Sequence, residues 1–187
     1  MKLHWLTILP GIALCFAPAH AQTGIYGAFD SVRLTATNVD GPSQTQTTNW
    51  YNGGEVGIYH NFFHMGPIAL GADVRGDRMS GSQQKYHSAL FGLRLAAKPP
   101  ALPIRPYMQA SIGVGGPTHS GLNGAGSIYS DKFQYLVAGG LDYTLVPHLD
   151  FRVLEIGYGK MSGISSGGTV PDTSLLNISS GLVLRFR

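Results

Sequence analysis

Hydrophobic and polar residues alternate with a period of two along most of the chain after its first twenty residues. In one clean example, Ile68, Leu70 and Val74 alternate with Asp73 and Arg75. This is the period of a β-strand whose two faces meet different surroundings. The pattern predicts eight strands, over residues 24–36, 49–63, 68–77, 85–97, 104–116, 132–145, 149–161 and 174–187.

The connections between these segments alternate in length. Those near residues 40–48, 78–84, 117–131 and 162–173 are long and polar, whereas those near 64–67, 98–103 and 146–148 are short and contain proline. Bacterial outer-membrane barrels have long outer loops and short periplasmic turns in this order. We therefore predict an all-β fold, a closed antiparallel up-and-down transmembrane β-barrel of about eight strands.

The seventh segment departs from simple alternation. Phe151, Val153 and Glu155 share one parity, which would turn a carboxylate toward lipid. A β-bulge between Val153 and Ile156 would shift the parity and return Glu155 to the polar face. We predict such a bulge.

The composition agrees with a sheet that meets an apolar phase. Charged residues make up 12% of the chain, about half of the roughly 25% typical of a soluble domain. The net charge of +3 is spread along the chain without a Lys/Arg block, so a nucleic-acid partner is not expected. After the first twenty residues, no run approaches the roughly 20 apolar residues that a spanning helix needs.

The first 21 residues have the pattern of a secretory signal peptide. A short basic region with Lys2 precedes an apolar stretch over residues 6–16, and Ala19-His20-Ala21 forms a small-x-small cleavage pattern. We predict cleavage before Gln22, which makes residues 1–21 a signal peptide and residues 22–187 the barrel domain. The single cysteine, Cys15, lies in the predicted signal peptide, so the mature chain would have no disulfide.

The polar faces of the predicted strands carry charges near the strand middles. In a narrow barrel these side chains would face the lumen and pair with one another, because an unpaired buried charge costs several kcal/mol. A soluble β-sandwich also alternates and stays open as an alternative. The predicted lumen charge network comprises Glu55, Asp73, Arg75, Arg94, Arg105, Asp142, Arg152 and Arg185.

Three stretches resemble a known family. The segments RPYM…SIGVG (residues 105–115), FRVLEIGY (151–158) and LVLRF (182–186) are similar to strands of OmpA/OmpX-like outer-membrane barrels. The resemblance implies a barrel-only member in the outer membrane of a Gram-negative-type bacterium, with lipid, lipopolysaccharide and the barrel-assembly machinery as partners. It also implies that the machinery reads an aromatic residue at the end of the last strand, here the penultimate Phe186.

The chain has few residues in patterns typical of catalysis, metal binding or phosphate binding. His60 and His64 have a helical metal-ligand spacing but fall on a strand and its turn, and His119 and His148 have no neighbouring cluster. The glycines of residues 121–126 lack the lysine and following helix of a phosphate loop. We therefore expect no enzyme, metal or cofactor, and a structural or surface-interaction role through the outer loops. Narrow-pore transport and a soluble lipocalin-like binding barrel are the alternatives.

Overall fold

The computed structural model describes residues 22–40, 43–82, 84–120, 127–129, 131–162 and 173–186. The predicted signal peptide, the glycines of residues 121–126 and Arg187 lie outside these residues. The described part contains no helix that could cross a membrane. Its strands are β1 (Gln22–Asp40), β2 (Ser43–Met65), β3 (Ile68–Ser80), β4 (Lys85–Ala97), β5 (Ile104–Ser120), β6 (Ser127–Tyr129), β7 (Lys132–Val146), β8 (Leu149–Ser162) and β9 (Thr173–Phe186).

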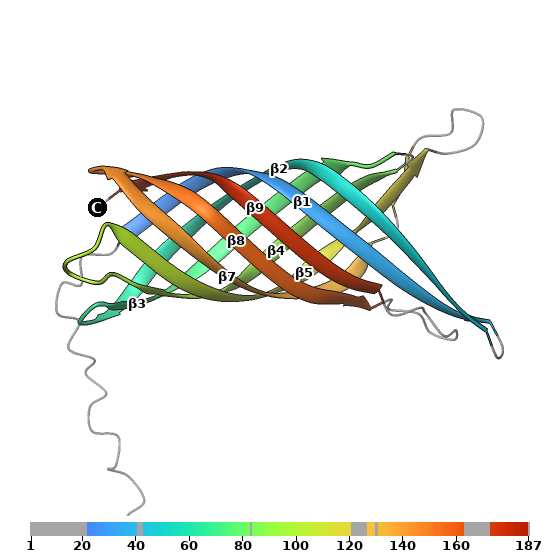
Figure 1. The fold of residues 1–187 in the computed structure, drawn as a ribbon, viewed down its shortest axis with the longest axis horizontal. Helices are drawn as coiled ribbons and strands as arrows, with labels where there is room; N and C mark the ends of the chain where they lie inside the picture. The colour runs from blue at the N-terminus through green and yellow to red at the C-terminus, as the bar shows by residue number, and fades with distance from the viewer. Residues whose placement is uncertain are drawn as a thin grey trace, which may run out of the picture.

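The eight long strands form a closed up-and-down barrel (Figure 1). Each pairs antiparallel with the next along the chain, β5 pairs with β7, and β9 returns to pair with β1. The short β6 adds to the end of β5. Every long strand therefore has a partner on both sides, which is what the backbone needs where no water can hydrogen-bond to it. The predicted fold class is confirmed.

The two ends of the barrel differ. At one end, which we call the turn end, short connections join β2 to β3, β4 to β5 and β7 to β8. Gly66 (φ 60°) and His148 (φ 78°) adopt the left-handed conformation that these tight turns require. At the opposite end, which we call the loop end, lie the strand termini Asp40, Ser80, Ser120 and Ser162.

The strands reach further at the loop end than the sequence pattern predicted. Residues 43–48, 78–80, 117–120 and 127–129 were expected in loops and instead form β-structure. A polar cross-strand contact accompanies the extension of β2, from Thr35 Oγ1 to Thr48 Oγ1 at 3.2 Å. Residues 43–48 are all polar, so the two-residue hydrophobic period could not reveal this part of the strand.

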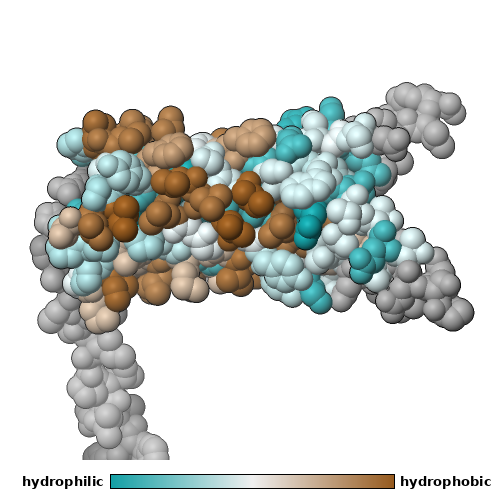
Figure 2. All heavy atoms as spheres, viewed as in Figure 1, coloured by the Kyte–Doolittle hydropathy of each residue, from teal (hydrophilic) through white to brown (hydrophobic). Residues whose placement is uncertain are grey.

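An apolar belt covers the outside of the barrel over its turn-end part. Figure 2 shows the belt in brown, with hydrophilic residues gathering toward the loop end. Outward side chains such as Val56, Phe29 and Met108 are more than 60% exposed. A contiguous exposed apolar surface of this kind marks contact with a membrane or a partner. The belt consists of Ile25, Phe29, Val56, Ile58, Phe62, Phe63, Val74, Phe91, Leu93, Leu95, Met108, Ile112, Val114, Val137, Val153, Leu154, Ile156, Tyr158, Leu182 and Leu184.

The bulge predicted in the seventh strand is present. The pairing of β8 with β9 shifts between Arg152 and Glu155, one residue earlier than predicted. Val153 and Leu154 both point outward, at 42% exposure each, while Arg152 and Glu155 on either side are buried. The extra residue thus keeps both charges inside the barrel and both apolar side chains outside.

The interior of the barrel has two zones. Toward the loop end lies an apolar group that we call the loop-side plug: Val32, Leu34, Tyr51, Met79, Tyr86, Leu90, Leu136, Met161 and Leu175. These side chains are at most 6% exposed. Toward the turn end the interior is polar and charged. Side chains therefore fill the barrel, as the width of eight strands allows.

Candidate functional site: the interior charge network

The structure places the eight charged residues predicted for the lumen on inward-facing strand positions. Seven of them are buried, at 1–5% exposure. The eighth, Arg105, is nearer the turn end, with 11% of its side chain exposed. They form two groups, a central one around Arg75, Arg94 and Arg152 and a smaller one around Arg105 and Arg185.

Arg75 and Arg152 link the carboxylates of the central group. Arg75 lies 3.1 Å from Glu55, 3.2 Å from Asp73 and 2.5 Å from Glu155. Arg152 contacts Glu55 at 3.5 Å, Asp142 at 3.2 Å and Glu155 at 3.3 Å. Each guanidinium thus faces three carboxylates that come from three different strands. Contacts of this kind tie strands together across the lumen as well as along the sheet.

Arg94 contacts two aromatic rings as well as a carboxylate. Its guanidinium lies 2.7 Å from Asp142 and stacks between Tyr59 and Tyr107, 4.1 Å and 3.8 Å from the ring centroids. Cation–π contacts gain strength when the cation is desolvated. The inward tyrosines are therefore part of the network.

A second group closes the turn end. Asp150 lies 2.6 Å from Arg185 and 3.9 Å from Arg105, and Arg105 donates to Gln22 Oε1 at 2.9 Å. These arginines border a cavity of about 530 Å³ at the turn-end mouth, which Lys98 and His148 also line.

The predicted network left out several inward residues. The missed acids are Asp30, Asp77, Asp150 and Glu155, and the missed neutral partners are Tyr26, Tyr59, Tyr107 and Gln109. The inward position of Asp30 could have been predicted from alternation, because Ile25 and Phe29 on the same strand have the opposite parity and face outward. Glu155 followed from the predicted bulge, although it was not included in the predicted network.

Glycines make room for the inward tyrosines. Three times, a tyrosine lies directly opposite a glycine on the neighbouring strand, and a Cβ on that glycine would overlap the phenol ring. A ring that covers a cross-strand glycine packs where no other side chain competes for the space. The pairs are Tyr26 with Gly57, Tyr59 with Gly24 and Tyr107 with Gly140.

Replacing Gly140 by valine should therefore destabilise the barrel. The new side chain would push Tyr107 away from Arg94 and Arg152, and overpacking of this kind costs about 1–3 kcal/mol. The matched control is Gly139→Val, because that outward position has only one backbone atom, at 3.9 Å, near an added Cβ. Urea unfolding in detergent micelles measures both. Equal stabilities of the two variants would contradict the pairing.

Among the described residues, the histidines do not form a metal site with one another. His60 is exposed and lies 2.9 Å from Thr23 Oγ1, His64 is exposed near the turn, and His148 is in its turn. The side chain of His119 lies outside the described part. His87, which sequence reasoning passed over, lies outside the lumen, 2.7 Å from Asp131 Oδ1 and 3.0 Å from Thr118 Oγ1.

Comparison with known proteins shows which solved structures share this fold. No protein-family model matches the sequence, and no curated protein sequence matches it. Two solved structures with TM-scores above 0.5 are Ail, the attachment invasion locus protein of Yersinia pestis, and Neisserial surface protein A. Ail has a TM-score of 0.53 and 14% identity, over 89% of this chain and 99% of its own. Neisserial surface protein A has a TM-score of 0.51 and 17% identity, over 87% and 97%. The chain therefore has the fold of the small eight-stranded outer-membrane β-barrels, as its resemblance to OmpA/OmpX-like barrels implied.

Proposed function

We propose that this protein is an integral barrel of the outer membrane of a Gram-negative-type bacterium, exported by its N-terminal signal peptide. In this proposal the barrel is a rigid anchor and the loop end presents a surface to partners outside the cell. The chain has no enzymatic role in the proposal. The turn end faces the periplasm, as short turns do in such barrels.

One observation carries the proposal, namely that apolar side chains cover the outside while ion pairs fill the inside. A soluble lipocalin-like barrel or sandwich would need the opposite arrangement, because its outer face meets water and its interior is the apolar core. Here Val56, Phe91 and Ile112 are more than half exposed, while Arg75 and Arg152 are at most 2% exposed. The contrast favours hydrocarbon as the surrounding phase.

Lipid, lipopolysaccharide and the assembly machinery are the proposed partners of the barrel wall. Phe186 points outward from the end of β9 and is 46% exposed, so its ring is accessible for recognition during assembly. Lipopolysaccharide would meet the outer surface where the apolar belt gives way to the polar loop end.

The names of the similar proteins support a surface role. Ail is named the attachment invasion locus protein, and it has been solved in complex with the heparin analogue sucrose octasulfate. Neisserial surface protein A is named for its location. We therefore propose that the loop end of this chain also contacts surface ligands.

Membrane integration and orientation can be tested together. The predicted mature chain has no cysteine, so single cysteines can be placed at Thr45, near the loop end, and at Leu102, in a turn. A membrane-impermeant maleimide should label Thr45→Cys but not Leu102→Cys in intact cells, and both after lysis. The protein should also resist a carbonate wash and migrate differently on gels with and without boiling. Release by carbonate, or labelling of Leu102→Cys alone, would contradict the proposal.

The structure offers the pore alternative little support. The nine side chains of the loop-side plug fill the lumen near the loop end, and ion pairs fill the middle. We therefore expect no steady single-channel conductance from the purified barrel in planar bilayers. Stable, ohmic channels that survive repurification would favour transport.

A further inference from the structure

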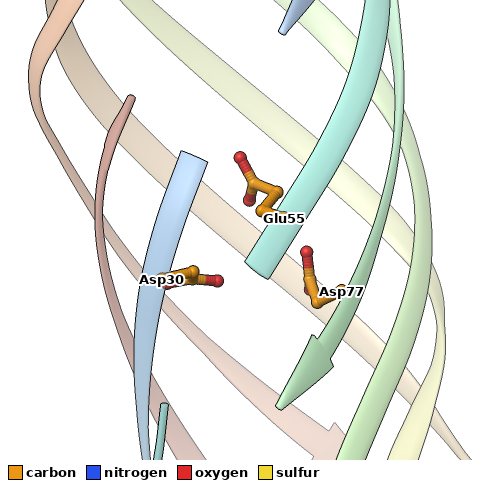
Figure 3. Close-up of side chains that lie close together, drawn as sticks. All are labelled: Asp30, Glu55 and Asp77. Carbon is orange, nitrogen blue, oxygen red and sulfur yellow. The ribbon is translucent and has the colours of Figure 1, made fainter. Parts of the chain in front are cut away.

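Three carboxylates meet inside the barrel at one level. They come from the adjacent strands β1, β2 and β3, and each offers an oxygen within 4.8 Å of the other two. Figure 3 shows Asp30, Glu55 and Asp77 close together between these strands. Glu55 and Asp77 are direct cross-strand partners, and like charges in that relation destabilise a sheet. All three carboxylates can therefore be ionised together only beside a compensating cation.

The arginines do not supply that compensation. Glu55 has Arg75 and Arg152 as partners, but Asp30 and Asp77 form no ion pair with any described side chain. Asp30 accepts from the amide of Asn177 at 2.7 Å, and Asp77 accepts from the hydroxyl of Ser88. Both partners are neutral donors, so Asp30 and Asp77, when ionised, have no counter-charge among the described side chains.

Unused oxygens point to the same conclusion independently. Glu55 Oε1 and Asp77 Oδ1 are fully buried and accept no hydrogen bond in the described part of the barrel. The Asp77 residue as a whole is 8% exposed and Glu55 is 1% exposed. Buried carboxylate oxygens are normally satisfied. Asp77 Oδ1 therefore has unused lone pairs within a group whose spacing suits a shared ligand, whereas Glu55 Oε1 has only the 3.5 Å ion pair with Arg152.

The buried carboxylates outnumber the arginines that face them by two, which equals the charge of one divalent cation. Seven carboxylates are buried in the described interior: Asp30, Glu55, Asp73, Asp77, Asp142, Asp150 and Glu155. Five guanidiniums face them: Arg75, Arg94, Arg105, Arg152 and Arg185. With every group ionised, the difference leaves two negative charges. They belong at Asp30 and Asp77, because each of the other carboxylates lies within 4 Å of an arginine.

We infer that Asp30, Glu55 and Asp77 form a binding site for a hard divalent cation, best suited to Ca²⁺. The donors are all oxygens, which Ca²⁺ and Mg²⁺ prefer over softer metals. Ca²⁺ tolerates irregular coordination, whereas Mg²⁺ demands near-ideal octahedral geometry. The ion would bridge β1, β2 and β3 directly beneath the loop-side plug. This inference does not depend on the proposed cellular role.

Calcium binding to the folded barrel tests the site. The mature protein is folded in detergent with metal-free buffers and dialysed against radioactive Ca²⁺, with wild type, Asp30→Asn, Asp77→Asn and Asp131→Asn in parallel. Asp131 is the matched control because its carboxylate lies outside the lumen and is half exposed. We expect one ion per wild-type and Asp131→Asn barrel, and affinity lowered at least about tenfold in the other two variants.

Thermal unfolding with and without Ca²⁺ gives a second readout, because a ligand that binds the folded state raises the melting temperature. Calcium should raise it for wild type and Asp131→Asn only. Without calcium, Asp30→Asn and Asp77→Asn should melt above wild type, since each removes an unbalanced charge. Heat-modifiable migration verifies that each variant folds. A wild-type barrel that takes up no calcium, or site variants that bind it as wild type does, would overturn the inference.

Discussion

Replacing Arg152 by alanine should destabilise the barrel by about 3–5 kcal/mol, the cost of removing one partner from a buried ion pair. Three carboxylates depend on this guanidinium, at 3.2–3.5 Å. It also lies 4.1 Å from the ring centroid of Tyr26 and 5.1 Å from that of Tyr107. Loss of the side chain would leave Asp142 with Arg94 alone, and Glu55 and Glu155 with Arg75 alone. Reversible urea unfolding in lipid vesicles measures the change.

Arg78→Ala is the control for this experiment. Arg78 lies on β3 but faces outward and is exposed, and surface substitutions of this kind usually change stability by no more than about 0.5 kcal/mol. A double variant, Arg152→Met with Glu155→Gln, should recover part of the loss, because it removes charges of both signs. If Arg152→Ala proved no more costly than Arg78→Ala, the network would have no role in stability.

Placing an arginine on the apolar belt should be the second most costly change. Leu93 lies on β4 between the outward side chains of Phe91 and Leu95 and is 54% exposed. Near the middle of a bilayer, an arginine on the lipid face of a barrel costs about 2–4 kcal/mol. Leu93→Arg should therefore unfold at lower urea concentration in phosphatidylcholine vesicles, and fold into them less completely.

Thr47→Arg provides the comparison, because Thr47 is exposed in the loop-end part of β2 beyond the belt. We expect its stability to stay within about 0.5 kcal/mol of wild type. The difference between the two variants should shrink in detergent micelles, which deform around a charge more easily than a bilayer. Equal stabilities in vesicles would mean that Leu93 does not face lipid.

The alternation of apolar and polar residues made the fold predictable from the sequence. Each predicted strand corresponds to a strand of the structure, and residues 85–97 match β4 at both ends. Even the irregularity in β8 could be predicted, because a simple register would have turned Glu155 toward lipid. The strand ends at the loop end could not, since Thr47 and Thr48 are polar whichever way they point.

The inward positions of the predicted charges follow from parity, but the contacts between them could not be predicted from the sequence. Parity assigns Arg94 and Asp142 to the inside, yet these residues are 48 positions apart and meet because β4 and β7 both pair with β5 and curve around the lumen. Tyr59 and Tyr107 share the parity of Glu55 and Arg105, but the predicted network included charged residues only. The acidic group of Asp30, Glu55 and Asp77 depends on the register of three strands, which hydrophobic pattern alone does not give.

The most direct test of the account is the environment of consecutive side chains on β5, residues 107–114. Single spin labels at these positions, in the barrel folded into lipid vesicles, report collisions with oxygen, which concentrates in hydrocarbon. We predict high oxygen accessibility at Met108, Ala110, Ile112 and Val114, and low accessibility at Tyr107, Gln109, Ser111 and Gly113, following their outward and inward positions. A profile without this two-residue period, or with its phase reversed, would contradict a barrel that turns its oily side chains to lipid and its charges to the axis.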